Sequence, residues 1–87
     1  TVIGAQAANE LLNIIGVKAS FVLTDYRNTI YISARSIDEI NVQIVMERLG
    51  GGGHLNIAGA QLDHYSITEA KDVLKQTLQK MLDEGDI

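Results

Sequence analysis

Four consecutive glycines at positions 50–53 constrain the fold of this chain more than any other sequence feature. A helix needs only one glycine to end, because glycine just after the C-cap adopts left-handed backbone angles without strain. Each further glycine costs about 0.5–1 kcal/mol relative to alanine where the backbone is ordered. Three more glycines in a chain of 87 residues therefore indicate a second cause, for which close approach of the backbone to a ligand is our interpretation.

The residue that follows the glycines suggests which ligand this would be. Successive backbone N–H groups without a Cβ nearby can enclose an anion, and His54 adds an imidazole able to donate to a phosphate oxygen. No lysine follows the run, which excludes a Walker loop, and the run closes a helix, which excludes a Rossmann turn. We also consider one helical turn over residues 54–58 that helps to hold a phosphate. A helix cap followed by a loose turn remains the alternative.

A second candidate for phosphate binding lies upstream, in the segment 29–35. Its polar and apolar residues alternate as in a half-buried strand, so Ser33 and Arg35 point away from the core. A guanidinium group matches the oxygens of a phosphate, and the Ser33 hydroxyl can add a donor. The alternative is a solvated polar face. Arg35 and the glycines can meet one ligand only if the next strand runs antiparallel or the loop folds back.

The remaining periodicities predict one α/β domain over residues 1–87, with a small mixed β-sheet of three or more strands and about three helices. Two Ser-x-x-Glu patterns, beginning at Ser36 and Ser66, predict helix starts. The two strands nearest the N-terminus are expected to form a hairpin. In chain order the expected elements are helix 5–15, strands 19–24 and 29–35, helix 40–49, strand 60–65 and a last helix whose apolar stripe reaches residue 82.

Composition narrows the classes of partner. The net charge is −4 and the seven Lys and Arg residues are scattered, whereas nonspecific binding of long nucleic acid needs a basic face. The chain has no cysteine, which excludes disulfides and thiolate metal sites. No run approaches the roughly 20 apolar residues that span a bilayer. The opening residues lack an initiator Met, so we expect a piece of a longer protein.

The segments ISARS (32–36) and INVQIVMERLGGGGHLNIAGAQL (40–62) resemble the DHHA1 domain of DHH/DHHA1 phosphodiesterases. The Gly-Gly-Gly-His and Ser-x-Arg-Ser motifs carry the resemblance. This superfamily includes RecJ-type exonucleases, nanoRNases and cyclic-di-AMP phosphodiesterases. Residues 7–23 and 41–54 are most similar to the membrane-anchored cyclic-di-AMP phosphodiesterases of Firmicutes. One departure is Ile57, where many members have alanine; we expect it to face the interior.

The resemblance implies a C-terminal domain that holds the nucleotide, while its own DHH domain, absent from this chain, binds two metal ions, usually manganese. The substrate would be a cyclic dinucleotide or short nucleotide. The resemblance assigns no catalytic or metal-binding residue to this chain, so we expect the chain alone to be inactive. A homodimer is one arrangement left open, and the longer protein is expected in the membrane with this domain on the cytoplasmic side. The implied contacts are Ser33, Arg35, Gly51, Gly52, Gly53 and His54.

Two other functions remain open from the sequence. A nanoRNase or RecJ-like nuclease would use the same residues on short or single-stranded nucleic acid. A non-enzymatic docking module would use the glycines only as a hinge, and it predicts that replacing Arg35 or His54 leaves the turnover of the longer protein intact.

Overall fold

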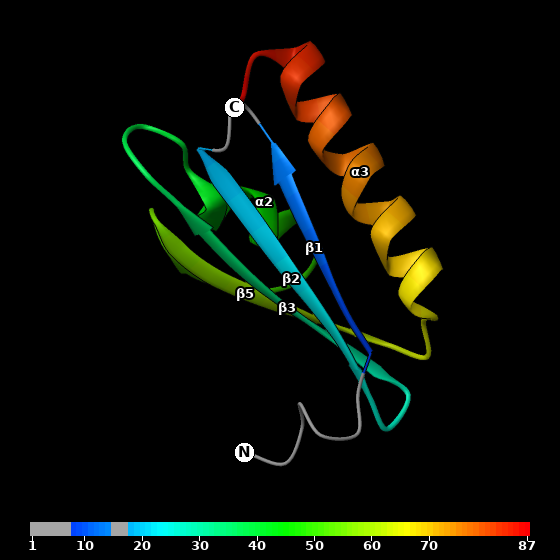
Figure 1. Cartoon of the computed structure of the whole chain (residues 1–87). Helices are drawn as coiled ribbons and strands as arrows, with labels where there is room; N and C mark the ends of the chain where they lie inside the picture. Colours follow the sequence, from blue (N-terminus) through cyan, green and yellow to red (C-terminus); the bar gives the residue numbers. More distant parts are fainter. Residues whose placement is uncertain (1–7, 15–17) are drawn as a thin grey trace.

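The computed structural model describes residues 8–14 and 18–87, with side chains described from residue 18 onward. Within these residues, five strands form one sheet in the order β1-β2-β3-β5-β4, and two helices accompany it (Figure 1). The elements are β1 (Ala8–Ile14), β2 (Ala19–Tyr26), β3 (Thr29–Ser36), α2 (Val42–Arg48), β4 (Gly52–His54), β5 (Ile57–Asp63) and α3 (Ile67–Glu84).

The α/β class is confirmed, with two corrections of detail. All four described strand pairings are antiparallel, so the sheet is not mixed in direction. The described part of the chain holds two helices rather than about three. Two-residue turns join β2 to β3 and β4 to β5, and strands joined in this way must reverse direction, which accounts for these two pairings.

The predicted helix over residues 5–15 is wrong where the structure can test it. Residues 8–14 form strand β1, which pairs with β2 from Ala8 opposite Asp25 to Ile14 opposite Ala19. Residues 5–7 and 15 lie outside the described residues. The apolar spacing fits a helix, but without β1 the long strand β2 would have an edge of unpaired backbone groups. This pairing depends on a partner strand and is invisible in the local pattern.

The predicted hairpin is confirmed between β2 and β3. Its turn consists of Arg27 and Asn28, both with positive φ, 53° and 65°. A two-residue turn of this kind matches the twist of the flanking strands. It brings Tyr26 opposite Thr29 and fixes the register of both strands. The predicted alternation in β3 follows from that register and is confirmed, with Ile32 buried and Arg35 exposed.

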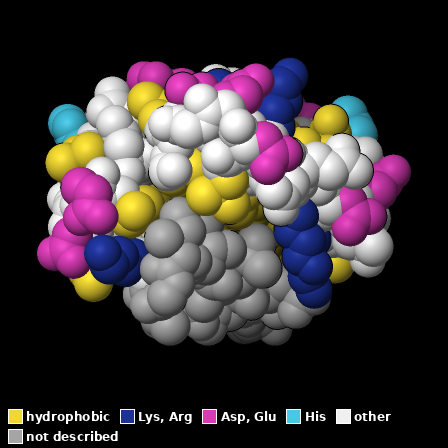
Figure 2. Space-filling view, turned by 90° about the horizontal axis from the view of Figure 1, so that it is seen from above, with side chains coloured by type: hydrophobic (Ala, Val, Ile, Leu, Met, Phe, Trp, Pro, Cys, Tyr) yellow, Lys and Arg dark blue, Asp and Glu magenta, His cyan; other side chains and the backbone are white. Residues whose placement is uncertain are grey.

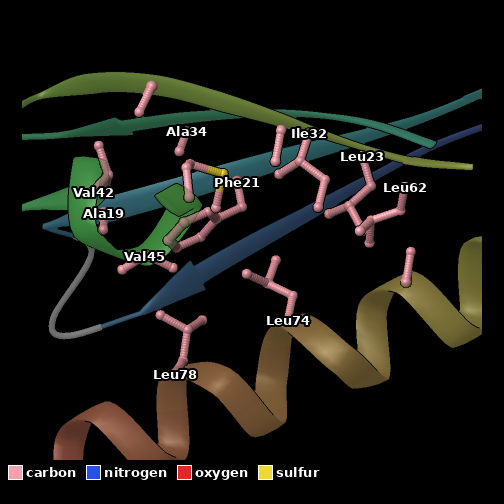
Figure 3. Packing of buried hydrophobic residues seen from close by; sticks show 14 of the residues in the cluster. Ala19, Phe21, Leu23, Ile32, Ala34, Val42, Val45, Leu62, Leu74 and Leu78 are labelled. Carbon is pink, nitrogen blue, oxygen red and sulfur yellow. The ribbon is translucent and has the colours of Figure 1, made fainter. Parts of the chain in front are cut away.

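The core lies between one face of the sheet and both helices (Figure 3). Phe21 and Leu23 of β2 are fully buried, and Leu74 of α3 packs against the same cluster. In α3 the predicted stripe is confirmed at its centre, while Leu82 is 43% exposed. Neither of the two described helices covers the other face of the sheet. Neither described helix is long and apolar enough to cross a membrane.

The helix starts show which capping pattern was right. The Ser66 pattern is confirmed, because its side chain accepts from the Glu69 amide at 3.0 Å and the Glu69 carboxylate accepts from the Ser66 amide at 2.9 Å. The Ser36 pattern is wrong. Helix α2 begins later, with Asn41 as N-cap, because Asp38 has a φ of 56° and leaves the helical path.

Candidate functional site

Four of the six candidate residues lie on the face of the sheet that neither described helix covers: Ser33, Arg35, Gly52 and His54. Strand β5 runs antiparallel to both neighbours, which is one of the two arrangements that would let Arg35 and the glycines meet one ligand. Residues directly opposite one another in such a sheet share a face. Two rows therefore cross the uncovered face, and we name each by its members. The first row is Arg35, Ile57 and His54, and the second row is Ser33, Gly59 and Gly52.

The first row contains two donors suited to phosphate. Arg35 and His54 are both exposed, and neither side chain makes a hydrogen bond or ion pair with another described residue. Two strand spacings separate their backbones, about 10 Å. Side chains of this length can reach toward one another over that distance, so a phosphate placed above Ile57 lies within reach of both. Solvation satisfies these groups here, which leaves them available to a ligand.

Gly50 has the helix-ending role expected of one glycine. Its φ is 85°, and its amide donates to the Glu47 carbonyl at 3.1 Å. The next amide, of Gly51, donates to the Met46 carbonyl at 2.8 Å. This pair of bonds is the Schellman arrangement, which satisfies carbonyls left free at the end of α2.

The other three glycines differ in what surrounds them. A Cβ on Gly51 would lie 2.0 Å from the Gly59 carbonyl oxygen, and one on Gly53 would lie 2.5 Å from the Cα of Ala58. A Cβ on Gly52 would meet nothing within 4 Å. Close packing against β5 therefore accounts for Gly51 and Gly53. At Gly52, in the second row, no neighbouring atom would obstruct a side chain. The absence of a side chain there fits close approach by a ligand.

The loop after the glycines is a tight hairpin, so the predicted helical turn over 54–58 is wrong. His54 and Ile57 pair directly, with a two-residue turn between them. Asn56 in that turn donates to the Ser36 hydroxyl at 2.9 Å, and its carbonyl accepts from the Ser36 amide at 3.0 Å. We call these two bonds the Ser36–Asn56 clasp. The clasp joins the end of β3, next to Arg35, to the hairpin that carries His54.

Ile57 does not face the interior as expected from the sequence. Its side chain is 54% exposed, between Arg35 and His54 in the first row. The reason is register: β5 begins at Ile57, three residues earlier than predicted, and alternation then turns Ala58 and Ala60 inward. Neither this position nor Asn56 is evident from the sequence as part of the site, because each depends on pairing between strands that are distant in sequence.

A cleft of about 540 Å³ lies beside the first row. Its lining includes Ser33, Gly51, Gly59, Tyr31 and Gln61. The structure thus brings two of the predicted contacts, Ser33 and Gly51, to the cleft. Arg35, Gly52, Gly53 and His54 are not part of its lining. Arg35 and His54 instead occupy the neighbouring row, so the candidate site consists of a cleft and an adjoining pair of phosphate donors.

Neither basic side chains nor possible metal ligands are clustered among the described residues. Lys and Arg side chains appear at separate places on the face drawn in Figure 2 rather than in one patch. The two histidine side chains lie at opposite sides of that view. His64 belongs to the turn beside Asn28, whose carbonyl accepts from the His64 amide at 2.7 Å. Among the described side chains, no three His, Cys, Asp or Glu residues gather in a way that fits a metal ion.

Comparison with known proteins identifies relatives whose sequences match this chain. The chain is 46% identical over 82 residues to "Cyclic-di-AMP phosphodiesterase GdpP" of Geobacillus thermodenitrificans, covering 93% of this chain and 12% of the relative. It is 53% identical over 75 residues to "Cyclic-di-AMP phosphodiesterase PdeA" of Listeria monocytogenes, covering 85% of this chain and 11% of the relative. The chain thus spans about a tenth of the length of these relatives.

A solved structure and a family model agree with these matches. An exopolyphosphatase-related protein from Bacteroides fragilis superimposes with a TM-score of 0.69 at 32% identity, covering 78% of this chain and 20% of that protein. The family model described as "DHHA1 domain" matches residues 2–81. This match spans both rows, the cleft and the Ser36–Asn56 clasp. The chain therefore belongs to the DHHA1 domain family.

Proposed function

We propose that this chain is the nucleotide-binding domain of a phosphodiesterase that hydrolyses cyclic-di-AMP to linear pApA. The observation that carries the proposal is the first row, where Arg35 and His54 stand exposed and unpaired on either side of Ile57. Two relatives that match most of this chain are named as cyclic-di-AMP phosphodiesterases, which supports the choice of substrate.

The chemistry of the row suits binding rather than bond cleavage. The planar guanidinium of Arg35 presents paired donors to two phosphate oxygens, and His54 can donate a further hydrogen bond. Ser33 and the bare backbone at Gly52 lie one row away and let a phosphate approach closely. The described residues of this chain therefore bind and orient the substrate.

The hydrolytic step is assigned to a DHH domain outside this chain. That domain would hold two divalent ions, usually manganese, which supply an activated water. The described side chains here offer no fitting set of metal ligands, so none of them is given that role. We further propose that the longer protein is anchored in the bacterial membrane with this domain on the cytoplasmic side.

A small anionic ligand is favoured over long nucleic acid. The net charge is −4, and on the described part of the face drawn in Figure 2 the Lys and Arg side chains lie apart. A continuous basic face supplies most of the affinity for a nucleic acid backbone. A nanoRNase or RecJ-like activity would appear as faster turnover of short oligonucleotides than of cyclic-di-AMP by the full-length protein. That outcome would overturn the substrate assignment while retaining the phosphate contacts.

The test is steady-state hydrolysis of cyclic-di-AMP by the full-length protein that carries this chain. We expect Arg35→Ala and His54→Ala to lower kcat/KM markedly, because loss of a desolvated charged contact costs about 2–5 kcal/mol. Arg27→Ala and His64→Ala are matched controls, since both residues are exposed and lie at turns at the far end of β3 and β5. If the row variants retain the activity of these controls, the docking-module function is correct instead.

A further inference from the structure

The cleft beside the first row has a lining that the phosphate contacts do not explain. Tyr31 of β3 lies directly opposite Gln61 of β5, on the uncovered face. Gln61 is exposed and Tyr31 is half-buried, and neither side chain bonds to another described residue. An aromatic ring and an amide without a bonding partner among the described residues thus lie side by side in the lining of the cleft.

The floor of the cleft is bare backbone. Gly59 lies between Ser33 and Gly52 in the second row, and a Cβ there would come within 2.9 Å of the Ile32 carbonyl oxygen. With no side chain at position 59 or 52, the part of the second row that β5 and β4 contribute is bare backbone, and only Ser33 of that row carries a side chain. A planar group can lie over this backbone, because only hydrogen atoms project from these two Cα atoms.

The spacing connects the cleft to the phosphate contacts. The row of Tyr31 and Gln61 lies two residues along the strands from the second row, about 7 Å. A further step of the same length reaches Arg35 and His54. A ligand whose phosphate occupies the space between the first and second rows therefore extends along the strands into the cleft.

We propose that the cleft lined by the Tyr31–Gln61 pair holds the nucleobase of the ligand, with the base over the bare backbone of Gly59 and beside this pair. This inference rests on the proposed function, since it places the base next to the phosphate that Arg35 and His54 hold. The Tyr31 ring offers its face for stacking, as aromatic side chains do with bases. The Gln61 amide carries a donor and an acceptor, the pattern that complements the N6 and N7 atoms of adenine.

The test compares two ligands that differ only in the base. Binding of adenosine 5′-monophosphate and of ribose 5-phosphate to the full-length protein is measured by calorimetry. Tyr31→Ala and Gln61→Ala are each expected to weaken the nucleotide roughly tenfold, the effect of losing one stacking or paired hydrogen-bond contact. Ribose 5-phosphate should bind these variants as it binds the unaltered protein. Tyr31→Phe keeps the ring and should restore nucleotide binding.

The controls separate this inference from the phosphate contacts. Gln76→Ala removes an exposed amide from α3 and should change neither ligand, whereas Arg35→Ala should weaken both. If Tyr31→Ala and Gln61→Ala leave the nucleotide unaffected, or weaken both ligands equally, the base site is overturned and the phosphate contacts stand. If Arg35→Ala changes neither ligand, or neither ligand binds the unaltered protein at millimolar concentration, the proposed function falls as well.

Discussion

At the scale of residues, the glycine run shows how one sequence feature serves several physical purposes. Gly50 ends α2, and Gly51 and Gly53 let β4 pack against the backbone of β5. Their number led the sequence analysis to infer a ligand, yet packing alone accounts for two of the three extra glycines. Gly52 is therefore the glycine best explained by a ligand, because it faces open space in the second row.

This division predicts opposite results for neighbouring substitutions. Gly51→Ala should lower the free energy of unfolding by about 1–3 kcal/mol, the cost of overpacking, because its Cβ would overlap the Gly59 carbonyl. Gly52→Ala should change stability by less than about 0.5 kcal/mol, as surface changes do, but weaken cyclic-di-AMP binding. Denaturant unfolding and calorimetry measure the two effects. A stable Gly52→Ala variant with unchanged affinity would show that this glycine has no role in binding.

At the scale of elements, the β4–β5 hairpin depends on the Ser36–Asn56 clasp for its position. The Ser36 hydroxyl also donates to the Ile40 carbonyl at 2.6 Å, and the Val42 amide donates to the Leu55 carbonyl at 2.9 Å. The hairpin is thereby joined to the end of β3 and to the start of α2. These contacts fix the position of the His54 backbone relative to the Arg35 backbone.

Asn56→Asp tests the clasp with little change of shape. The substitution removes the NH₂ donor and places a carboxylate near the Asp38 and Ile40 carbonyls, to which Asn56 now donates at 3.4 Å. We expect a loss of about 1–3 kcal/mol in the free energy of unfolding, the cost of an unsatisfied polar group, together with amide shifts at Arg35 and His54. Gln79→Ala removes an exposed hydrogen bond, from the Gln79 side-chain amide to Asp83 in α3, and serves as control. A variant that matches this control would mean that the clasp does not position the row.

At the scale of the whole molecule, local patterns predicted most of the fold. Short-range chemistry predicts the α/β class, the hairpin of β2 and β3 and the capping box at Ser66. It also predicts the outward direction of Ser33 and Arg35. The resemblance to DHHA1 domains added the family, which the match to residues 2–81 confirms.

What the sequence could not predict depends on pairing between distant segments. Residues 8–14 became a strand because β2 supplies a partner, and Ile57 turned outward because β5 begins earlier than its apolar pattern suggests. The cleft joins residues of β3 and β5 that are about thirty positions apart in sequence. The metal-binding domain, the membrane anchor and a homodimer stay predictions about the longer protein.

The central claim is that a nucleotide phosphate binds at the two rows on the uncovered face of the sheet. The most direct measurement is a titration of amide chemical shifts with cyclic-di-AMP, in this chain and in the full-length protein. The account predicts shifts concentrated at residues 33–36 and 50–59 that His54→Ala abolishes and His64→Ala retains. If those amides remain unchanged in the full-length protein while it turns over cyclic-di-AMP, the substrate is held elsewhere and the account is contradicted.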